Sequence, residues 1–255
     1  MALGIAKRGL ADHVYEQLKD RLFESRYGRG GRLPVDEIAA EMQSSRQPVM
    51  DALKRLELEG FVSIVPQVGC KVREYTPQEI HDFYQLFSFG EALVTELAAV
   101  RADAEDLITL RVISEQIGRL GANKSTEQDQ ARMYRVLNRK FHNEIRRIAQ
   151  SASLTELVES MGDRSDFFIG TSGRPMFAET LMTAHSEHEE VLQAITKGNG
   201  RAAGDAMKRH ILATDARLQE FLDDNGAAPA KRSAAKTKVA SPRSMARNAS
   251  TARRA

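Results

Sequence analysis

The sequence predicts a mainly α-helical protein with a small N-terminal domain and a C-terminal all-α bundle of six or seven helices. Residues 33–73 combine helical periodicity with two short strand-like runs, whereas residues 76–225 show helical periodicity and almost no strand signals. Residues 226–255 contain eight lysine or arginine residues and no acidic residue, a composition typical of a disordered tail. We therefore expect domains at residues 1–75 and 76–225, followed by a basic tail.

The N-terminal domain is expected to contain two helices separated by a short turn. Asp36 and Glu37 complement the positive end of a helix dipole, which predicts a short helix at residues 35–42. Serine caps and apolar residues at helical spacing predict a second helix at residues 45–59, which Gly60 ends.

Two apolar runs follow at residues 62–65 and 70–72, and the Pro-Gln-Val-Gly segment between them predicts a hairpin. Helix, turn, helix and hairpin in this order form a winged helix-turn-helix, which places its second helix in the DNA major groove. The domain is therefore expected to bind double-stranded DNA.

The second helix begins with polar residues that suit DNA contacts. Arginine pairs with guanine and glutamine with adenine, whereas lysine and hydroxyl groups hold phosphates. Arg46 is thus the first candidate for reading a base, and Gln47 is the second. A solvated helix face is the alternative interpretation of these residues. The full candidate set, including two residues of the hairpin turn, is Ser44, Ser45, Arg46, Gln47, Lys54, Arg55, Gln67 and Gly69.

The stretch SSRQPVMDALKRLELEGFV resembles the signature of the GntR family of bacterial transcription regulators, and the resemblance covers about residues 10–75. In that family, Ser-Arg-x-Pro-Val-Arg-x-Ala-Leu opens the recognition helix. Met50 replaces the second arginine of this signature, so a common DNA contact is absent or is replaced, with Lys54 as a candidate. Asp36 stands where some members have a basic DNA contact. The operator sequence therefore cannot be transferred from the family.

The C-terminal domain contains three histidines on three separate expected helices. The first helix begins with a capping box of Thr76 and Glu79, and the others are expected near residues 103–121, 126–150, 153–170, 176–198 and 200–224. His142, His188 and His210 could converge on one metal ion, because imidazole suits Zn²⁺ or Ni²⁺. From spacing alone, surface or core roles are the commoner alternative.

The segments LNRKFHNEI, HSEHEEVLQAITKGN and AMKRHI resemble the metal-ligand segments of the FadR C-terminal (FCD) type of effector domain. This resemblance implies that Asn138, His142, His188 and His210 bind a divalent metal. Asn138 replaces the usual aspartate, and a neutral amide oxygen binds a cation less strongly than a carboxylate does.

The FCD resemblance also implies a small organic acid as effector, with its carboxylate on the metal. Arg135, Arg146 and His185 are candidate effector contacts, although each also suits a surface role. We expect a homodimeric repressor that a metabolite releases from a two-fold symmetric operator. Activation, or a response to metal without an organic effector, is an alternative.

A metal-dependent enzyme fused to a DNA-binding domain is a further alternative. It is disfavoured because Glu144 and Glu187, which neighbour the histidines in sequence, are expected to point to other helix faces, so neither would serve as a general base.

Composition agrees with a cytoplasmic regulator. The chain offers no apolar run long enough to span a membrane, and its N-terminus lacks an apolar signal core. The formal net charge of +2 conceals a tail of +8 and a remainder of −6. The tail could attract DNA phosphates, or it could be a solvated extension with little effect. The single cysteine, Cys70, excludes an internal disulfide.

Overall fold

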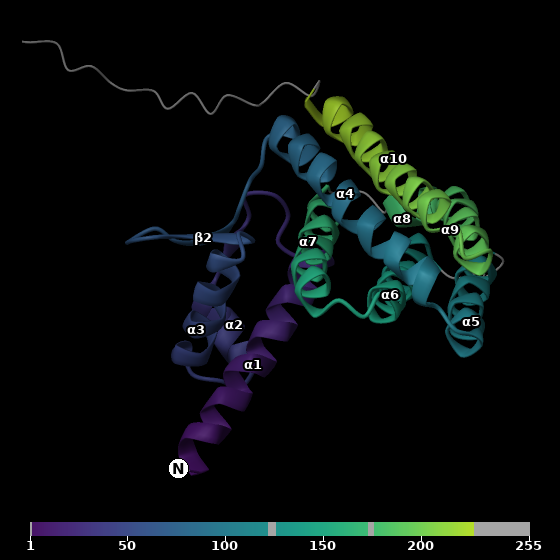
Figure 1. Cartoon of the computed structure of the whole chain (residues 1–255). Coiled ribbons are helices and arrows are strands. Elements are labelled where there is room, and N and C mark those ends of the chain that lie inside the picture. The colour runs from purple at the N-terminus through teal and green to yellow at the C-terminus, as the bar shows by residue number, and fades with distance from the viewer. Residues whose placement is uncertain (1, 122–125, 173–175, 227–255) are drawn as a thin grey trace, which may run out of the picture.

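The computed structural model describes residues 2–121, 126–172 and 176–226 of the 255-residue chain (Figure 1). The expected basic tail therefore lies almost entirely outside the described residues. The mainly helical fold predicted from the sequence is confirmed. No helix in the described part of the chain is long and apolar enough to cross a lipid bilayer.

The N-terminal part is a winged helix-turn-helix, as predicted. Its elements in chain order are α1 (Ala2–Phe23), β1 (Arg32–Leu33), α2 (Val35–Glu41), α3 (Arg46–Leu58), β2 (Val62–Val65) and β3 (Gly69–Val72). The three strands form an antiparallel sheet in the order β1-β3-β2, with Leu33 and Ile64 on either side of the buried Cys70. The hairpin of β2 and β3 is the expected wing, whereas β1 and α1 were not predicted from the sequence.

The C-terminal part is a bundle of seven helices in the described residues, within the predicted range. Its helices are α4 (Pro77–Arg101), α5 (Ala104–Leu120), α6 (Glu127–Ile148), α7 (Ala152–Thr171), α8 (Met176–Glu179), α9 (Leu181–Thr196) and α10 (Gly200–Gly226). The Thr76–Glu79 capping box begins α4 as predicted. The single helix expected at residues 176–198 is instead divided at Thr180, whose φ and ψ of −109° and 8° interrupt the helix.

Helix α4 is central to the bundle, and α10 runs back along its length (Figure 1). The winged helix-turn-helix meets the bundle at α7, which packs against α1. Aromatic rings fill this junction: the Phe61 and Phe167 centroids lie 5.1 Å apart, as do those of Tyr75 and Phe168. Because ring pairs at this spacing pack tightly, the two parts are joined by apolar contacts as well as by the chain.

Candidate metal centre and DNA-binding helix

The structure brings the three histidines together in the core of the bundle. His142 lies on α6, His188 on α9 and His210 on α10. Each is at most 5% exposed, and one ring nitrogen of each lies within 4.8 Å of the others. The Nε2 atoms of His188 and His210 are 3.2 Å apart. Three imidazoles in this arrangement can hold one Zn²⁺ or a similar ion, with a coordination position left for a ligand.

Two carboxylates lie behind these imidazoles. Glu187 Oε2 is 2.7 Å from Nδ1 of His210, and Glu187 also pairs with Arg217. Glu91 Oε1 is 3.4 Å from Nδ1 of His142, but this nitrogen has no hydrogen-bond partner among the described residues, so only His210 is hydrogen-bonded to a carboxylate. A carboxylate at the outer nitrogen directs the other nitrogen towards a metal and raises its basicity. The expectation that Glu187 points to another helix face is wrong, because α9 and α10 pack side by side and bring it to His210.

The ring nitrogens of His188 and His210 are available for coordination at neutral pH. Burial lowers the pKa of His188 well below its ordinary value, and the neighbouring His210 and His142 lower it further. Burial also lowers the pKa of His210, although Glu187 opposes this shift. Metal binding requires neutral imidazole, and these shifts favour that form at pH 7.

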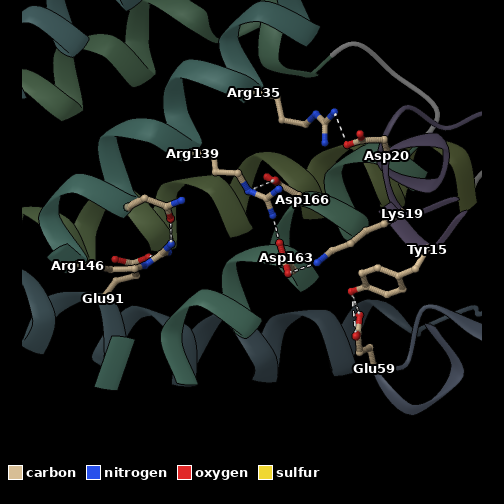
Figure 2. Close-up of polar contacts among 11 residues, drawn as sticks. Tyr15, Lys19, Asp20, Glu59, Glu91, Arg135, Arg139, Arg146, Asp163 and Asp166 are labelled. Atoms are coloured by element: carbon tan, nitrogen blue, oxygen red, sulfur yellow. Dashed lines mark hydrogen bonds and ion pairs between the residues drawn. The ribbon is translucent and has the colours of Figure 1, made fainter. Parts of the chain in front are cut away.

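A buried ion pair stands beside His142. Burial by itself would raise the pKa of Glu91, but Arg146 and His142 outweigh it and hold this pKa at about 2. Glu91 is fully buried and pairs with Arg146 (Figure 2). Oε2 of Glu91 and Nε of Arg146 have no hydrogen-bond partner among the described residues. Unsatisfied buried polar atoms are uncommon, and at a functional site they often mark where water or a ligand binds.

Glu91 and Arg146 line a cavity of about 50 Å³, which has room for a few water molecules. Tyr134 donates a hydrogen bond of 3.3 Å to Oδ1 of Asn138 at the cavity wall. Arg139 also lines the cavity, and we did not select it from the sequence. Its spacing with His142 and Arg146 on one face of α6 could have identified it. The polar and charged cavity-lining residues include Glu91, Tyr134, Asn138, Arg139, His142, Arg146, Ser165, Asp166, His210 and Arg217.

The other two candidate effector contacts lie outside this cavity. Arg135 faces α1, where its Nη2 lies 3.5 Å from Asp20 Oδ1. His185 packs against α5, so closely that a Cβ atom on Gly118 would lie 2.7 Å from its Nε2. Among the residues selected as effector contacts, only Arg146 lines the cavity.

The candidate base reader, Arg46, is at the start of α3 and is exposed. Its side chain is 65% exposed and pairs with Asp36 of α2. Gln47 donates a hydrogen bond of 2.8 Å to Asp51. Lys54 is also exposed, with its Nζ 3.8 Å from Asp51 Oδ1. Helix α3 therefore presents exposed polar groups that suit a DNA groove.

The remaining DNA-binding candidates lie at three places. Arg55 faces α1, where it stacks 3.6 Å from the Tyr15 ring centroid and pairs with Asp12, and it also pairs with Glu59 at the end of its own helix. Ser44 and Ser45 form the turn before α3, whereas Gln67 and Gly69 lie at the wing tip with φ of 62° and 114°. Met50, at the position of the family's second arginine, packs against the hydrophobic core.

Comparisons with known proteins identify the family. The family described as "Bacterial regulatory proteins, gntR family" matches residues 10–72, and the FCD domain matches residues 84–213, half of the chain. The chain belongs to the GntR family of bacterial regulators. Its two parts thus combine the GntR DNA-binding domain with an FCD effector domain.

Several GntR-type regulators are similar over most of their length. The HTH-type transcriptional regulator YdhC of Bacillus subtilis is 27% identical over 78% of this chain and 84% of its own. The Exu regulon transcriptional regulator of Escherichia coli is 25% identical over 85% of this chain and 88% of its own. The structure of E. coli McbR/YncC superposes with a TM-score of 0.71 at 20% identity, covering 84% of this chain and 98% of that one. The GntR protein described here is accordingly a DNA-binding transcriptional regulator and not an enzyme.

Proposed function

We propose that this GntR regulator is a repressor whose operator affinity changes when a small carboxylate binds beside a divalent metal in the FCD domain. The convergence of three buried imidazoles next to a polar cavity is the observation that supports this proposal. Arg146 and Arg139 on the cavity wall supply positive charge for an anionic ligand.

His142, His188 and His210 would hold the metal, which we propose to be zinc or nickel. When bound, the metal would supply a positive charge that attracts the ligand's carboxylate. Asn138 would be a weaker fourth ligand than the aspartate usual in the FCD type, because its amide oxygen is neutral. Its side chain is on the same cavity wall as His142.

Two copies of the chain would bind one operator in the cytoplasm. Winged helix-turn-helix dimers place two recognition helices on half-sites about one helical turn of DNA apart. Ligand binding would alter the relation between these helices, and the resulting coupling free energy is typically about 1 to 3 kcal/mol. The E. coli relative named HTH-type transcriptional repressor GlaR supports repression as the direction of control.

Elemental analysis of the purified chain tests the metal site. We expect near-stoichiometric metal in the wild type and none in the His142→Ala, His188→Ala double variant. His13→Ala is the matched control, because His13 is exposed on α1. Absence of metal from the wild type after reloading with Zn²⁺ and Ni²⁺ would contradict the proposal.

Operator binding by the reloaded protein separates the two kinds of regulator. If the metal alone changes operator affinity and carboxylates add nothing, the chain is a metal sensor. If a carboxylate changes the affinity only when metal is bound, the proposed effector mechanism is supported.

A further inference from the structure

One segment of α7 contacts both the cavity and the DNA-binding domain. Ser165 and Asp166 of this segment line the cavity beside the histidines. Arg164 donates a hydrogen bond of 2.7 Å to the carbonyl oxygen of Glu59, at the end of the recognition helix. Phe167 packs against Phe61, which follows that helix. Helix α7 therefore connects the cavity wall to the DNA-binding domain through direct contacts.

A chain of charged groups crosses the same boundary (Figure 2). Arg139 of α6 lines the cavity, and its Nε is 3.7 Å from Asp166 Oδ2. Arg139 also pairs with Asp163 of α7, and the other oxygen of Asp163 pairs with Lys19 of α1. Arg139, Asp163 and Lys19, which we call the charge bridge, thus join the cavity wall to the first helix of the DNA-binding domain.

Within the charge bridge, the pair of Lys19 and Asp163 is more shielded from solvent than ordinary surface pairs, whereas the Arg139 side chain is 36% exposed. The side chains of Lys19 and Asp163 are 12% and 16% exposed. Burial lowers the pKa of Lys19, as expected for an ammonium group with little water around it. Removing one member from a shielded pair costs more than removing one from an exposed pair, because the remaining charge is left poorly solvated.

We propose that the charge bridge of Arg139, Asp163 and Lys19 transmits ligand occupancy of the cavity to α1. This inference rests on the proposed function, since it requires an anionic ligand in the cavity. A ligand carboxylate beside Arg139 would compete with Asp163 for the guanidinium group, which binds carboxylates through two parallel hydrogen bonds. Asp163 would then keep only Lys19, so the connection from the cavity wall on α6 to α7 and α1 would be lost, and α1 could shift together with α7 relative to α6.

Helix α1 can pass this change to the DNA-binding surface. It packs along α3, the recognition helix, with buried Leu18 and Leu22 in one hydrophobic core with Leu53 and Leu56. A shift of α1 therefore alters the position of α3. Ligand binding changes operator affinity only if the ligand binds one position of α1 more tightly than the other. The ligand would do so because it competes with Asp163 for Arg139.

Replacing Arg139 tests the charge bridge without knowledge of the natural effector. Arg139→Gln removes the guanidinium group from Asp163, as the ligand is proposed to do. We expect the Kd for an operator duplex, selected from random DNA with the wild-type chain, to rise by about fivefold or more. We also expect faster amide hydrogen exchange in the second half of α1.

Arg132→Gln is the matched control. Arg132 is also on α6 and pairs with Glu24, just beyond α1, at 3.1 Å, but it is exposed and does not line the cavity. This control makes the same charge change and is expected to leave the Kd within about twofold of wild type.

Lys19→Met provides a second variant at the opposite end of the charge bridge. Lys19 does not line the cavity, so we expect its metal content to match wild type while its operator Kd rises as in Arg139→Gln. The double variant should lose little more affinity than either single variant, because both changes break one connection.

Wild-type Kd and unchanged exchange of α1 in both single variants would overturn the inference, as would additive losses in the double variant. If the selection returns no duplex, the proposed function fails, but hydrogen exchange still decides whether the charge bridge holds α1. If Arg139→Gln fails to fold, Lys19→Met gives the result by the same two measurements.

Discussion

Two glutamates, Glu187 and Glu91, lie behind the histidines of the candidate metal centre. Glu187 hydrogen bonds Nδ1 of His210 at 2.7 Å, and this contact presents Nε2 of the same ring to His188. Spacing along the chain made the histidines candidates, because each lies in an amphipathic stretch, and the resemblance to the FCD type implied that they bind a metal. Spacing did not identify Glu187, because that contact depends on how α9 packs against α10.

Glu187→Gln should therefore weaken metal binding without unfolding the bundle. Loss of a carboxylate behind a metal-binding histidine typically lowers metal affinity about 10- to 100-fold. Competition with a chromogenic chelator measures this affinity. Glu190→Gln is the control, since Glu190 is an exposed residue of the same helix that pairs with Arg209 at 3.3 Å. Equal metal affinity in both variants would show that His210 is not oriented through Glu187.

Arg46 is the residue expected to read a base in the operator. Arg46→Ala should weaken specific operator binding by about 1 to 3 kcal/mol and relax the preference at one position of each half-site. Fluorescence anisotropy with operator duplexes mutated at single positions measures both effects. Lys54→Ala should instead weaken all duplexes similarly, if Lys54 holds a phosphate. An unchanged sequence preference in Arg46→Ala would remove Arg46 from this role.

At the scale of elements, the parts that the sequence predicted are those with local signals. The Thr76–Glu79 capping box, the apolar spacing of α3 and the turn of the wing each lie within a few neighbouring residues. Strand β1 has only two residues, and its pairing of Arg32 with Lys71 spans a long stretch of sequence. It could not be predicted because a strand of this length is defined by its partner rather than by its own pattern.

Helices α4 and α6 are joined through the buried pair of Glu91 and Arg146, which makes their packing sensitive to pH. The pKa of Glu91 is about 2 in the folded chain, below its ordinary value of 4.5. A lowered carboxyl pKa stabilises the fold above the unfolded value, and this stabilisation is lost as pH falls from about 4.5 towards 2. The shift corresponds to about 3 kcal/mol.

Glu91→Gln should accordingly lower the free energy of unfolding at pH 7 by about 3 kcal/mol or more, because it also leaves Arg146 buried without its partner. The difference from wild type should shrink between pH 4.5 and pH 3. Urea unfolding of both proteins at pH 7, 4 and 3 tests this. A difference that stays constant with pH would mean that the carboxyl group of Glu91 is not held ionised by its neighbours.

On the scale of the whole molecule, the two domains are joined where α7 closely contacts the end of α1. Gly170 lies where α7 meets Phe23, and a Cβ atom at Gly170 would overlap the backbone of Phe23. Only glycine allows the two helices to approach this closely. The same approach brings Lys19 to Asp163, so the charge bridge and this glycine contact depend on one spacing between the domains.

Gly170→Ala should therefore push α1 away from α7 and weaken both stability and operator binding. Overpacking at such a contact costs about 1 to 3 kcal/mol, measured as a lower free energy of unfolding. Gly9→Ala is the control, because a Cβ atom at Gly9 of α1 meets nothing within 4 Å and alanine favours a helix. If Gly170→Ala kept wild-type stability and operator affinity, α1 would be free to move without consequence for DNA binding. Since the proposed metal ligands lie on α6, α9 and α10, metal content should remain unchanged in this variant and so distinguish a separated domain boundary from a disrupted bundle.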